Sequence, residues 1–279
     1  MKIKYLGTAA AEGFPAAFCN CQHCLRARRE LSYEWRTRSQ ALIDGDLLID
    51  LPSETYMHAM RFGIDLSAIR TLLVTHSHTN HFYAQELVNR GDKFAYRMAA
   101  QTLDIYGNEG VFEVFREGTA REMREDVSEG IKFHCIQPFT RFETGGYEVF
   151  MLLATHMQAE KALLFCIRKE GKTLFYLNDT GLLSEACYTY LAEQKLCADF
   201  VSFDCTLADS ALPHSPRHMG FLENEIVREK LIKCGAASAE TKYCVTHFSH
   251  NSAPFRDRIE EEAAKRGFLA AHDGSEFIF

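Results

Sequence analysis

Three histidines crowd into one short segment, and they constrain this chain more than any other feature of its sequence. The segment reads THSHTNH at positions 75–81 and follows an apolar run, Thr71–Thr75, that is typical of a buried β-strand. His76 and His78 alternate along extended backbone, so we expect their side chains to point the same way, and His81 follows where a helix is predicted to begin. Because neutral imidazole is a common metal ligand, the segment predicts a metal site at a strand end.

Three further candidate ligands directly follow other predicted strands. His156 comes after MLLAT, Asp179 after LFYLN and His247 after YCVT. Any one of them alone would be an ordinary polar residue at the end of a strand. Together with the histidine segment, they supply enough imidazoles for two metal ions and a carboxylate that can bridge them.

This order of residues resembles the ligand series of the metallo-β-lactamase superfamily, and the resemblance spans nearly the whole chain. It implies a four-layer αββα sandwich, in which two β-sheets pack face to face under helices. The implied ligands are His76, His78 and His156 for a first metal, His81 and His247 for a second, and Asp179 as the bridging and catalytic carboxylate.

One position departs from the family pattern, which usually has an aspartate where this chain has Asn80. An amide oxygen can bind a metal but carries no charge, so the second metal would lose one anionic ligand. Three outcomes follow: a weakened dinuclear centre, a mononuclear enzyme, or a metal-binding protein with little activity. We favour the weakened dinuclear centre because His81, Asp179 and His247 are present.

A cysteine cluster predicts a second metal site. Cys19, Cys21 and Cys24 form a C-x-C-x-x-C pattern, whereas the other seven of the ten cysteines are scattered singly among apolar neighbours. Three thiols this close favour zinc over a disulfide, and tetrahedral zinc needs a fourth ligand. We choose His250 rather than His23, because ring strain inside the cysteine loop would hinder His23. The sequence thus predicts a structural zinc loop at about residues 18–30.

The histidine series and the cysteine cluster together resemble a smaller group of families within this superfamily. GTAAAEGFPAAFCNCQHC followed by HSHTNH and THFSHN is similar to the cyclic phosphate phosphodiesterases of the carbon-phosphorus lyase (phosphonate degradation) pathway. The opening also resembles pyrroloquinoline quinone biosynthesis protein B, whose family departs further from the histidine series. The resemblance implies a hydrolase of small or cyclic phosphodiesters, with one structural Zn²⁺ and one or two Zn²⁺ or Mn²⁺ ions whose bound hydroxide attacks phosphorus.

Two residues outside the ligand series are further candidates for the active site. His218, in PHSPRHMG at positions 213–220, matches the family's active-site histidine, and His214 is the nearby alternative. The reaction needs such a group, because the leaving alkoxide requires a proton donor. Asp204 follows the predicted strand Phe200–Phe203, and we expect it to contact the metal centre or a ligand histidine.

The chain is long enough to bury a large core, with 279 residues of which 47% are hydrophobic. Predicted strands and helices alternate without a linker, so we expect a single domain over residues 1–279. They include hairpins at 44–46 and 169–172 and helices at 81–89, 100–116 and 254–266. This pattern alone fits either two packed sheets or an open doubly wound sheet.

Charge and hydropathy limit the partners. The net charge of −7 repels polyanions, and no apolar run approaches the roughly 18 residues of a membrane span. We therefore expect a cytoplasmic protein that acts on a small phosphodiester and binds neither nucleic-acid polymers nor membranes; homodimer formation is left open. The alternatives are a transfer-RNA 3′-processing-like nuclease, a hydrolase of another ester, and a non-catalytic metal-binding or cofactor-carrier protein.

Overall fold

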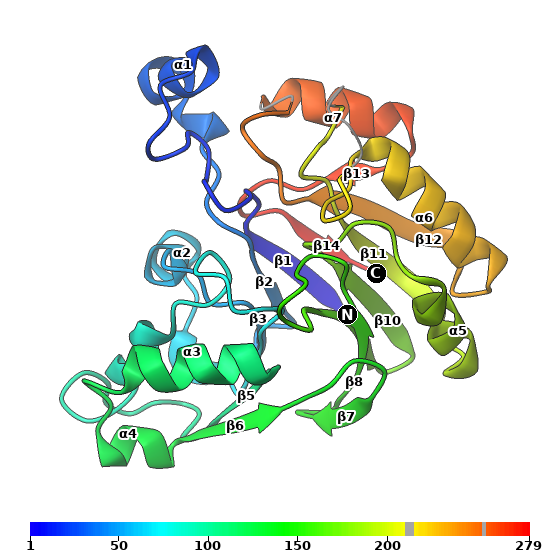
Figure 1. Cartoon of the computed structure of the whole chain (residues 1–279). Coiled ribbons are helices and arrows are strands. Elements are labelled where there is room, and N and C mark those ends of the chain that lie inside the picture. The colour runs from blue at the N-terminus through cyan, green and yellow to red at the C-terminus, as the bar shows by residue number, and fades with distance from the viewer. Residues whose placement is uncertain (210–214, 253–254) are drawn as a thin grey trace.

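Two β-sheets pack face to face in the computed structural model, which describes residues 1–209, 215–252 and 255–279 (Figure 1). Within these residues each sheet has seven strands. The first has the order β14-β1-β2-β3-β4-β5-β6 and the second β13-β12-β11-β10-β9-β8-β7. Helices cover both outer faces, so the αββα sandwich is confirmed and the open doubly wound sheet is wrong.

The first sheet changes from antiparallel to parallel pairing at β3. Strands β1 to β3 pair antiparallel, with the predicted hairpin at residues 44–46, and strands β3 to β6 pair parallel. Its strands are β1 (Lys2–Gly7), β2 (Gln40–Ile43), β3 (Leu47–Ile49), β4 (Thr71–Leu73), β5 (Leu103–Gly107), β6 (Ile131–Cys135) and β14 (Glu276–Ile278).

The second sheet changes in the same way at β10. Strands β7 to β10 are antiparallel and β10 to β13 are parallel, so β10, β11 and β12 end at the same edge of the sheet. Its strands are β7 (Arg141–Thr144), β8 (Tyr147–Leu153), β9 (Leu163–Lys169), β10 (Lys172–Leu177), β11 (Ala198–Asp204), β12 (Ala237–Thr246) and β13 (Leu269–Ala270).

Helices divide between the two outer faces, and α1 projects from the body of the molecule (Figure 1). Helices α2 to α4 lie beside the first sheet and α5 to α7 beside the second. The helices are α1 (Gln22–Glu30), α2 (Thr55–Phe62), α3 (Glu109–Thr119), α4 (Glu125–Glu129), α5 (Glu185–Glu193), α6 (Phe221–Lys233) and α7 (Arg256–Lys265). In the described part of the chain, no helix has both the length and the apolarity needed to cross a membrane.

Strand β8 shows how the layers bury both faces of a sheet. Val149 and Met151 pack in the cluster between the two sheets, whereas Phe150 and Leu152 point outward into the cluster formed with α5, α6 and α7. Successive side chains of a strand point to opposite faces, so a strand covered on both sides has a nearly continuous apolar sequence. The run YEVFMLL therefore marks an inner position in this sandwich.

Two predicted helices differ from the structure. The helix predicted at 100–116 is wrong over its first half, which forms β5, and α3 begins only at Glu109, where the Asn108 side chain accepts a hydrogen bond from the Val111 N–H. The segment predicted as a helix from His81 is a turn that leads into a short 3₁₀ helix at Ala84–Asn89. Position 254, the predicted start of the last helix, lies outside the described residues, and α7 begins at Arg256.

Candidate metal centre

The histidines and the carboxylate predicted to bind two metals converge where strands of both sheets end. The first histidine segment follows β4, and the other residues follow β8, β10 and β12. In each of the following groups, the potential ligand atoms lie within 4.8 Å of one another: His76, His78 and His156; His76, His81 and Asp179; Asp179, Asp204, His218 and His247. The groups share His76 and Asp179, so they form one continuous centre.

The first group consists of three imidazoles that face one another. His76 Nε2 lies 3.0 Å from His78 Nδ1, and His156 Nε2 lies 3.3 Å from the same His78 atom. Burial lowers the pKa of all three, and the other histidines nearby lower it further despite the opposing effect of Asp179. An imidazole whose pKa is lowered from the ordinary value stays neutral at pH 7, and the neutral form is the one that binds a metal ion.

Asp179 stands between this group and a second pair of histidines. Its Oδ2 atom lies 2.5 Å from His81 Nε2, 3.2 Å from His247 Nε2 and 3.9 Å from His76 Nε2. In the described part of the chain, neither Asp179 Oδ2 nor Nε2 of His81 or His247 has a partner in hydrogen-bonding geometry, although all three atoms are buried. Buried polar atoms rarely lack partners, so this arrangement fits a site that closes around cations.

Asp50 supports His81 and was not predicted from the sequence. It follows β3, is fully buried, and its Oδ2 lies 2.7 Å from His81 Nδ1. Its other oxygen accepts hydrogen bonds of 2.9 Å from the backbone N–H and the hydroxyl of Thr75. A carboxylate on the far nitrogen fixes an imidazole's orientation, so Asp50 keeps His81 Nε2 directed at Asp179. The available signal was an acidic residue directly after the buried strand LLI.

Backbone conformation also distinguishes this centre. Asp50, Asp179 and His247 have φ angles of 64°, 52° and 65°, in the left-handed region that residues with a side chain rarely adopt. Each lies within two residues of the end of a strand. There the left-handed conformation ends the alternation of side chains between the two faces of the sheet, so the side chain takes a different direction. Strained residues of this kind cluster at functional sites, because the surrounding structure must hold them in place.

His218 lies beside the centre and is paired with Asp204. Its Nδ1 is 3.1 Å from Asp204 Oδ2 and 3.4 Å from Asp179 Oδ1. Burial disfavours its charged form, but the attraction and hydrogen bond of Asp204 outweigh burial and raise the pKa of His218 to about 9. Asp204 Oδ2 also lies 3.5 Å from Nδ1 of the candidate ligand His247, so the predicted contact of Asp204 with a ligand histidine is present. Thr206 Oγ1 lies between them, 3.0 Å from Asp204 Oδ2 and 2.8 Å from His247 Nδ1. The alternative, His214, lies outside the described residues.

Asn80 occupies the turn between His78 and His81 and is half-buried. That turn brings His81 back towards the centre, with the backbone N–H of His81 bonded to the carbonyl of His78 at 2.8 Å. The metal-binding role of Asn80 therefore stays a prediction.

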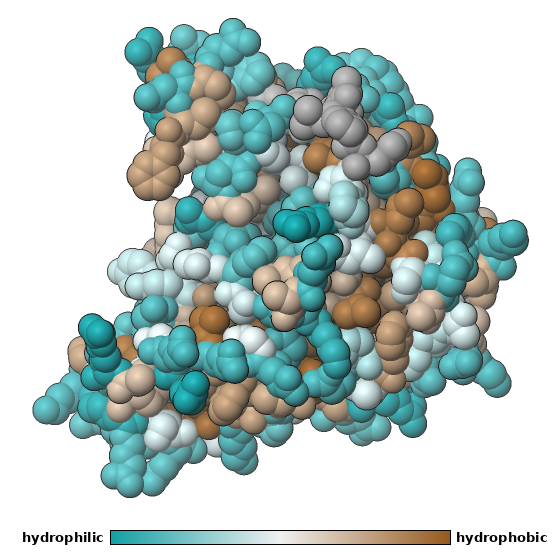
Figure 2. Space-filling model, in the orientation of Figure 1, coloured by the Kyte–Doolittle hydropathy of each residue, from teal (hydrophilic) through white to brown (hydrophobic). Residues whose placement is uncertain are grey.

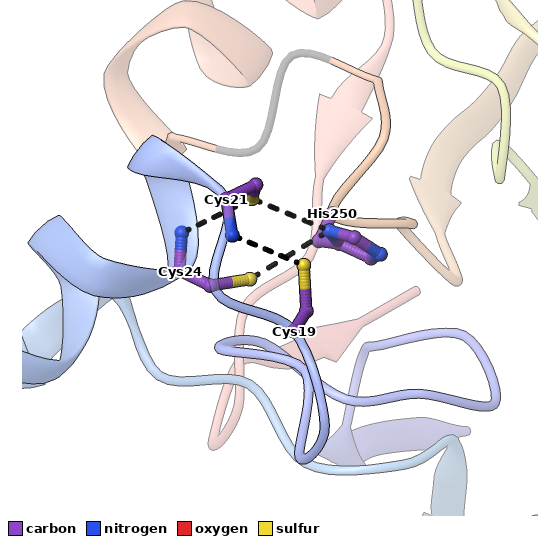
Figure 3. Close-up of side chains that lie close together, drawn as sticks. All are labelled: Cys19, Cys21, Cys24 and His250. Atoms are coloured by element: carbon purple, nitrogen blue, oxygen red, sulfur yellow. Dashed lines mark hydrogen bonds between the residues drawn. The ribbon is translucent and has the colours of Figure 1, made fainter.

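The four residues predicted for structural zinc also come together (Figure 3). His250 Nδ1 lies 3.6 Å from Cys24 Sγ and 3.9 Å from Cys21 Sγ, and with Cys19 the four potential ligand atoms lie within 4.8 Å of one another. All three cysteines are free thiols. His23, the alternative ligand, packs instead against the ring of Phe255, 5.5 Å between centroids.

The zinc loop predicted at 18–30 is a loop only as far as Cys21, which caps the N-terminus of α1. The hydrogen bond from the Cys24 N–H lowers the pKa of Cys21 to about 6, whereas burial raises the pKa of Cys24 to about 11. A thiolate at a helix N-terminus, two further thiols and one imidazole form the kind of tetrahedral set that zinc prefers. The residues present therefore fit one zinc ion.

Comparison with known proteins identifies the family of this chain. Residues 39–270 match the family model described as Anti-Pycsar protein Apyc1. The chain belongs to the Apyc1 family. The matched region contains all the predicted ligands of the histidine centre and His250, but it begins after the three cysteines.

Solved structures similar to this Apyc1-family chain share its whole fold. A diphosphatase of the PhnP family has 21% sequence identity and a TM-score of 0.74, with 100% of this chain and 97% of that chain covered. Zn²⁺-bound PqqB from Methylobacterium extorquens has 18% identity and a TM-score of 0.72, with both chains fully covered. A metallo-beta-lactamase fold protein, YhfI from Bacillus subtilis, has 18% identity and a TM-score of 0.71, with 99% and 98% covered. The predicted metallo-β-lactamase fold is confirmed, and the chain resembles the PhnP-family protein and PqqB in fold.

A curated relative matches only in part. Ribonuclease Z from Microcystis aeruginosa is 26% identical over 156 residues, which are 56% of this chain and 44% of that protein. The chain thus matches less than half the length of that ribonuclease.

Proposed function

We propose that this Apyc1-family chain is a metal-dependent phosphodiesterase that hydrolyses small or cyclic phosphodiesters. The observation that carries the proposal is the position of Asp179, whose Oδ2 atom lies within 4 Å of three histidine nitrogens from two groups. A buried carboxylate between two sets of imidazoles is the arrangement that a two-metal hydrolase needs.

The residues divide into two ligand sets. His76, His78 and His156 would hold the first ion, His81 and His247 the second, and Asp179 would bridge them; Zn²⁺ and Mn²⁺ are the ions we propose. When bound, such ions supply the nucleophile by lowering the pKa of water, and they polarise the phosphoryl oxygens. The orphaned buried atoms of Asp179, His81 and His247 support this division.

We assign His218 as the group that donates a proton to the leaving alkoxide. Its Nδ1 contacts Asp204 at 3.1 Å, which leaves Nε2–H as the proton that the ring can donate. Asp204 raises the pKa of His218 to about 9 against the effect of burial, so the ring carries this proton at neutral pH. General acids placed beside a leaving group typically contribute 10²- to 10⁴-fold to a rate.

Several features support a small phosphodiester as the substrate. The net charge of −7 gives little attraction for a long polyanion. The names of two similar proteins, a diphosphatase and a ribonuclease, both refer to cleavage at phosphate groups, which supports a phosphorus substrate over a thioester or a β-lactam. Asn80 favours a second candidate, a non-catalytic metal-binding protein, because it removes one anionic ligand from the second ion.

Cys19, Cys21, Cys24 and His250 hold one structural Zn²⁺ in this proposal. Metal binding by residues 226 and 229 positions apart in the chain would stabilise the folded state directly. Because the thiols must remain reduced, the site fits the cytoplasm, where we place the protein.

A substrate panel tests the function. Purified protein with added Mn²⁺ or Zn²⁺ is assayed on bis(p-nitrophenyl) phosphate, 2′,3′- and 3′,5′-cyclic nucleotides, a thioester and nitrocefin. We expect turnover of phosphodiesters only, and its loss in Asp179→Asn. Turnover of the thioester or nitrocefin alone would overturn the phosphodiester assignment. If nothing turns over but Asn80→Asp is active, the natural protein is the metal-binding candidate.

A further inference from the structure

One carboxylate joins the two loops that supply the first ligand set. Glu160 lies in the loop between β8 and β9, four residues after His156, and its Oε1 atom accepts a 2.9 Å hydrogen bond from the backbone N–H of Ser77. Its Oε2 atom accepts a second hydrogen bond from the Ser77 hydroxyl. Ser77 is the residue between His76 and His78, so this side chain fixes the backbone from which both imidazoles extend.

Glu160 is itself held from the other side by Asn108. The Asn108 amide donates a 2.7 Å hydrogen bond to Glu160 Oε1 and a 3.0 Å hydrogen bond to the carbonyl of Lys161. Asn108 is only 2% exposed and its oxygen caps α3 through the Val111 N–H, at 3.0 Å. The carboxylate is thus anchored to the end of β5 and the start of α3, which are rigid parts of the first sheet and its covering layer.

The space around Glu160 is also closely filled. A Cβ atom at Gly110, in the first turn of α3, would lie 2.9 Å from Glu160 Cδ and 3.0 Å from Oε2. The glycine therefore lets the helix approach the carboxylate closely. His78, by contrast, is exposed, so its position opposite His156 depends on its backbone more than on packing around its ring.

We propose that Glu160 is a positioning residue for the metal site of His76, His78 and His156. It binds no metal itself. By fixing Ser77 to the loop that carries His156, it keeps His78 Nδ1 within 3.3 Å of His156 Nε2, the separation at which one ion can bind both rings. This role rests on the proposed function, because it requires that the three histidines bind a metal.

A purely electrostatic role is the main alternative. Glu160 lines a cavity of about 540 Å³ whose other acidic residues, Glu109, Glu113 and Glu117, lie along α3, where hydrophilic residues predominate on the surface (Figure 2). A negative charge there would attract any cation, with no requirement for a hydrogen bond to Ser77. Glu160→Gln separates the two roles, since glutamine keeps an acceptor oxygen for the Ser77 and Asn108 donors but has no charge. Its NH₂ group can donate to the Ser77 hydroxyl, which can also accept.

The test measures metal binding instead of catalysis. Metal-free wild type, Glu160→Ala, Glu160→Gln and the control Glu113→Ala are titrated with Co²⁺ and followed by visible absorption, and the thermal unfolding of each metal-free protein is recorded. Glu113 is a matched control because it is an exposed carboxylate on the same cavity. We expect Glu160→Ala to lower the affinity for one of the two ions of the histidine centre by about 10- to 100-fold, which is typical of lost supporting hydrogen bonds, and to leave binding at the cysteine site unchanged. Glu160→Gln should stay within about threefold of wild type and Glu113→Ala should match it.

A second variant covers the case in which Glu160→Ala fails to fold. Gly110→Ala displaces the carboxylate but keeps its charge, and alanine suits a helix, so we expect a folded protein with weakened binding of the same ion. Wild-type affinity in Glu160→Ala, or equal losses in Glu160→Ala and Glu160→Gln, would overturn the proposal. Because no readout depends on turnover, an absence of hydrolysis would count against the proposed function alone.

Discussion

Gly181 offers a sharp test of whether the position of His218 controls the reaction. It lies two residues after Asp179, and a Cβ atom built there would be 2.3 Å from the carbonyl oxygen of Pro216 and 3.0 Å from Thr155 Oγ1. Ordinary van der Waals contact begins at about 3.4 Å, so Gly181→Ala requires the backbone at Pro216 to move by about 1 Å. His218 is two residues further along that segment.

The expected effect follows from this displacement. A shift of about 1 Å in a positioned catalytic group costs about 100-fold in rate, which corresponds to about 2.7 kcal/mol. We expect kcat on the best phosphodiester to fall by about that factor in Gly181→Ala. The metal content should fall much less than the rate, because the three atoms nearest to the added Cβ belong to Pro216 and Thr155 and not to a ligand side chain. Of the first ligand set, His156 contacts the displaced segment, with its Nδ1 3.4 Å from the carbonyl oxygen of Arg217.

Steady-state kinetics and metal analysis of Gly181→Ala check this, with Gly118→Ala as the control. The three atoms nearest to a Cβ at Gly118, in α3, are side-chain atoms of Ala84 and Gln85 at 3.3 Å or more. A folded Gly181→Ala protein with wild-type kcat would refute the reasoning. So would a loss of activity that merely parallels a loss of metal.

Three further predictions concern separate parts of the molecule. Cys21→Ser should remove about one zinc per chain and lower the thermal midpoint, whereas His78→Ala should remove active-site metal with less loss of stability; metal analysis and calorimetry decide, and equal effects would contradict two distinct sites. Asp204→Asn should move the alkaline loss of activity to lower pH, because Asp204 raises the pKa of His218 to about 9 and the ring acts when protonated; an unchanged pH–rate profile would exclude that role. Burial lowers the pKa of His58 from 6.5 to about 4. Between these two pH values the unfolded chain binds a proton at His58 that the folded chain does not, so the free energy of unfolding falls as the pH falls from 6.5 to 4. At 1.36 kcal/mol per pKa unit the loss is at most about 3 kcal/mol. Urea unfolding at pH 7 and pH 5 should show a smaller pH dependence in His58→Gln than in wild type, and an equal dependence would assign the effect to other groups.

The candidate ligands that the structure brings together could be found from the sequence because their signals are local. Each of His156, Asp179 and His247 directly follows an apolar run, and the cysteines lie within six positions. Residues that act through a distant partner carry no such signal. Asp50 supports a histidine 31 residues away, and Glu160 bonds to a residue 83 positions earlier.

The failed prediction at 100–116 has the same cause. Strand β5 pairs in parallel with β4 and β6, which belong to separate segments of the chain, so its strand state depends on non-local hydrogen bonds. Its sequence, LDIYG, is short and ambiguous between helix and strand. Asn108, a good N-cap, was the local indication that a helix starts after it and not before.

The segment that follows β12 carries two histidines, His247 and His250, that lie three positions apart and belong to different clusters. His247 turns inward to Asp179, and His250 reaches the cysteines, while Phe248 between them exchanges backbone hydrogen bonds with Thr8 and Ala10. An insertion of a single residue here would carry one imidazole out of its cluster. Removing the N-terminal segment that carries Thr8, Ala10 and the three cysteines would therefore release the backbone that carries His247, a candidate ligand of the histidine centre. The length of the stretch from His247 to His250 is set by both clusters at once.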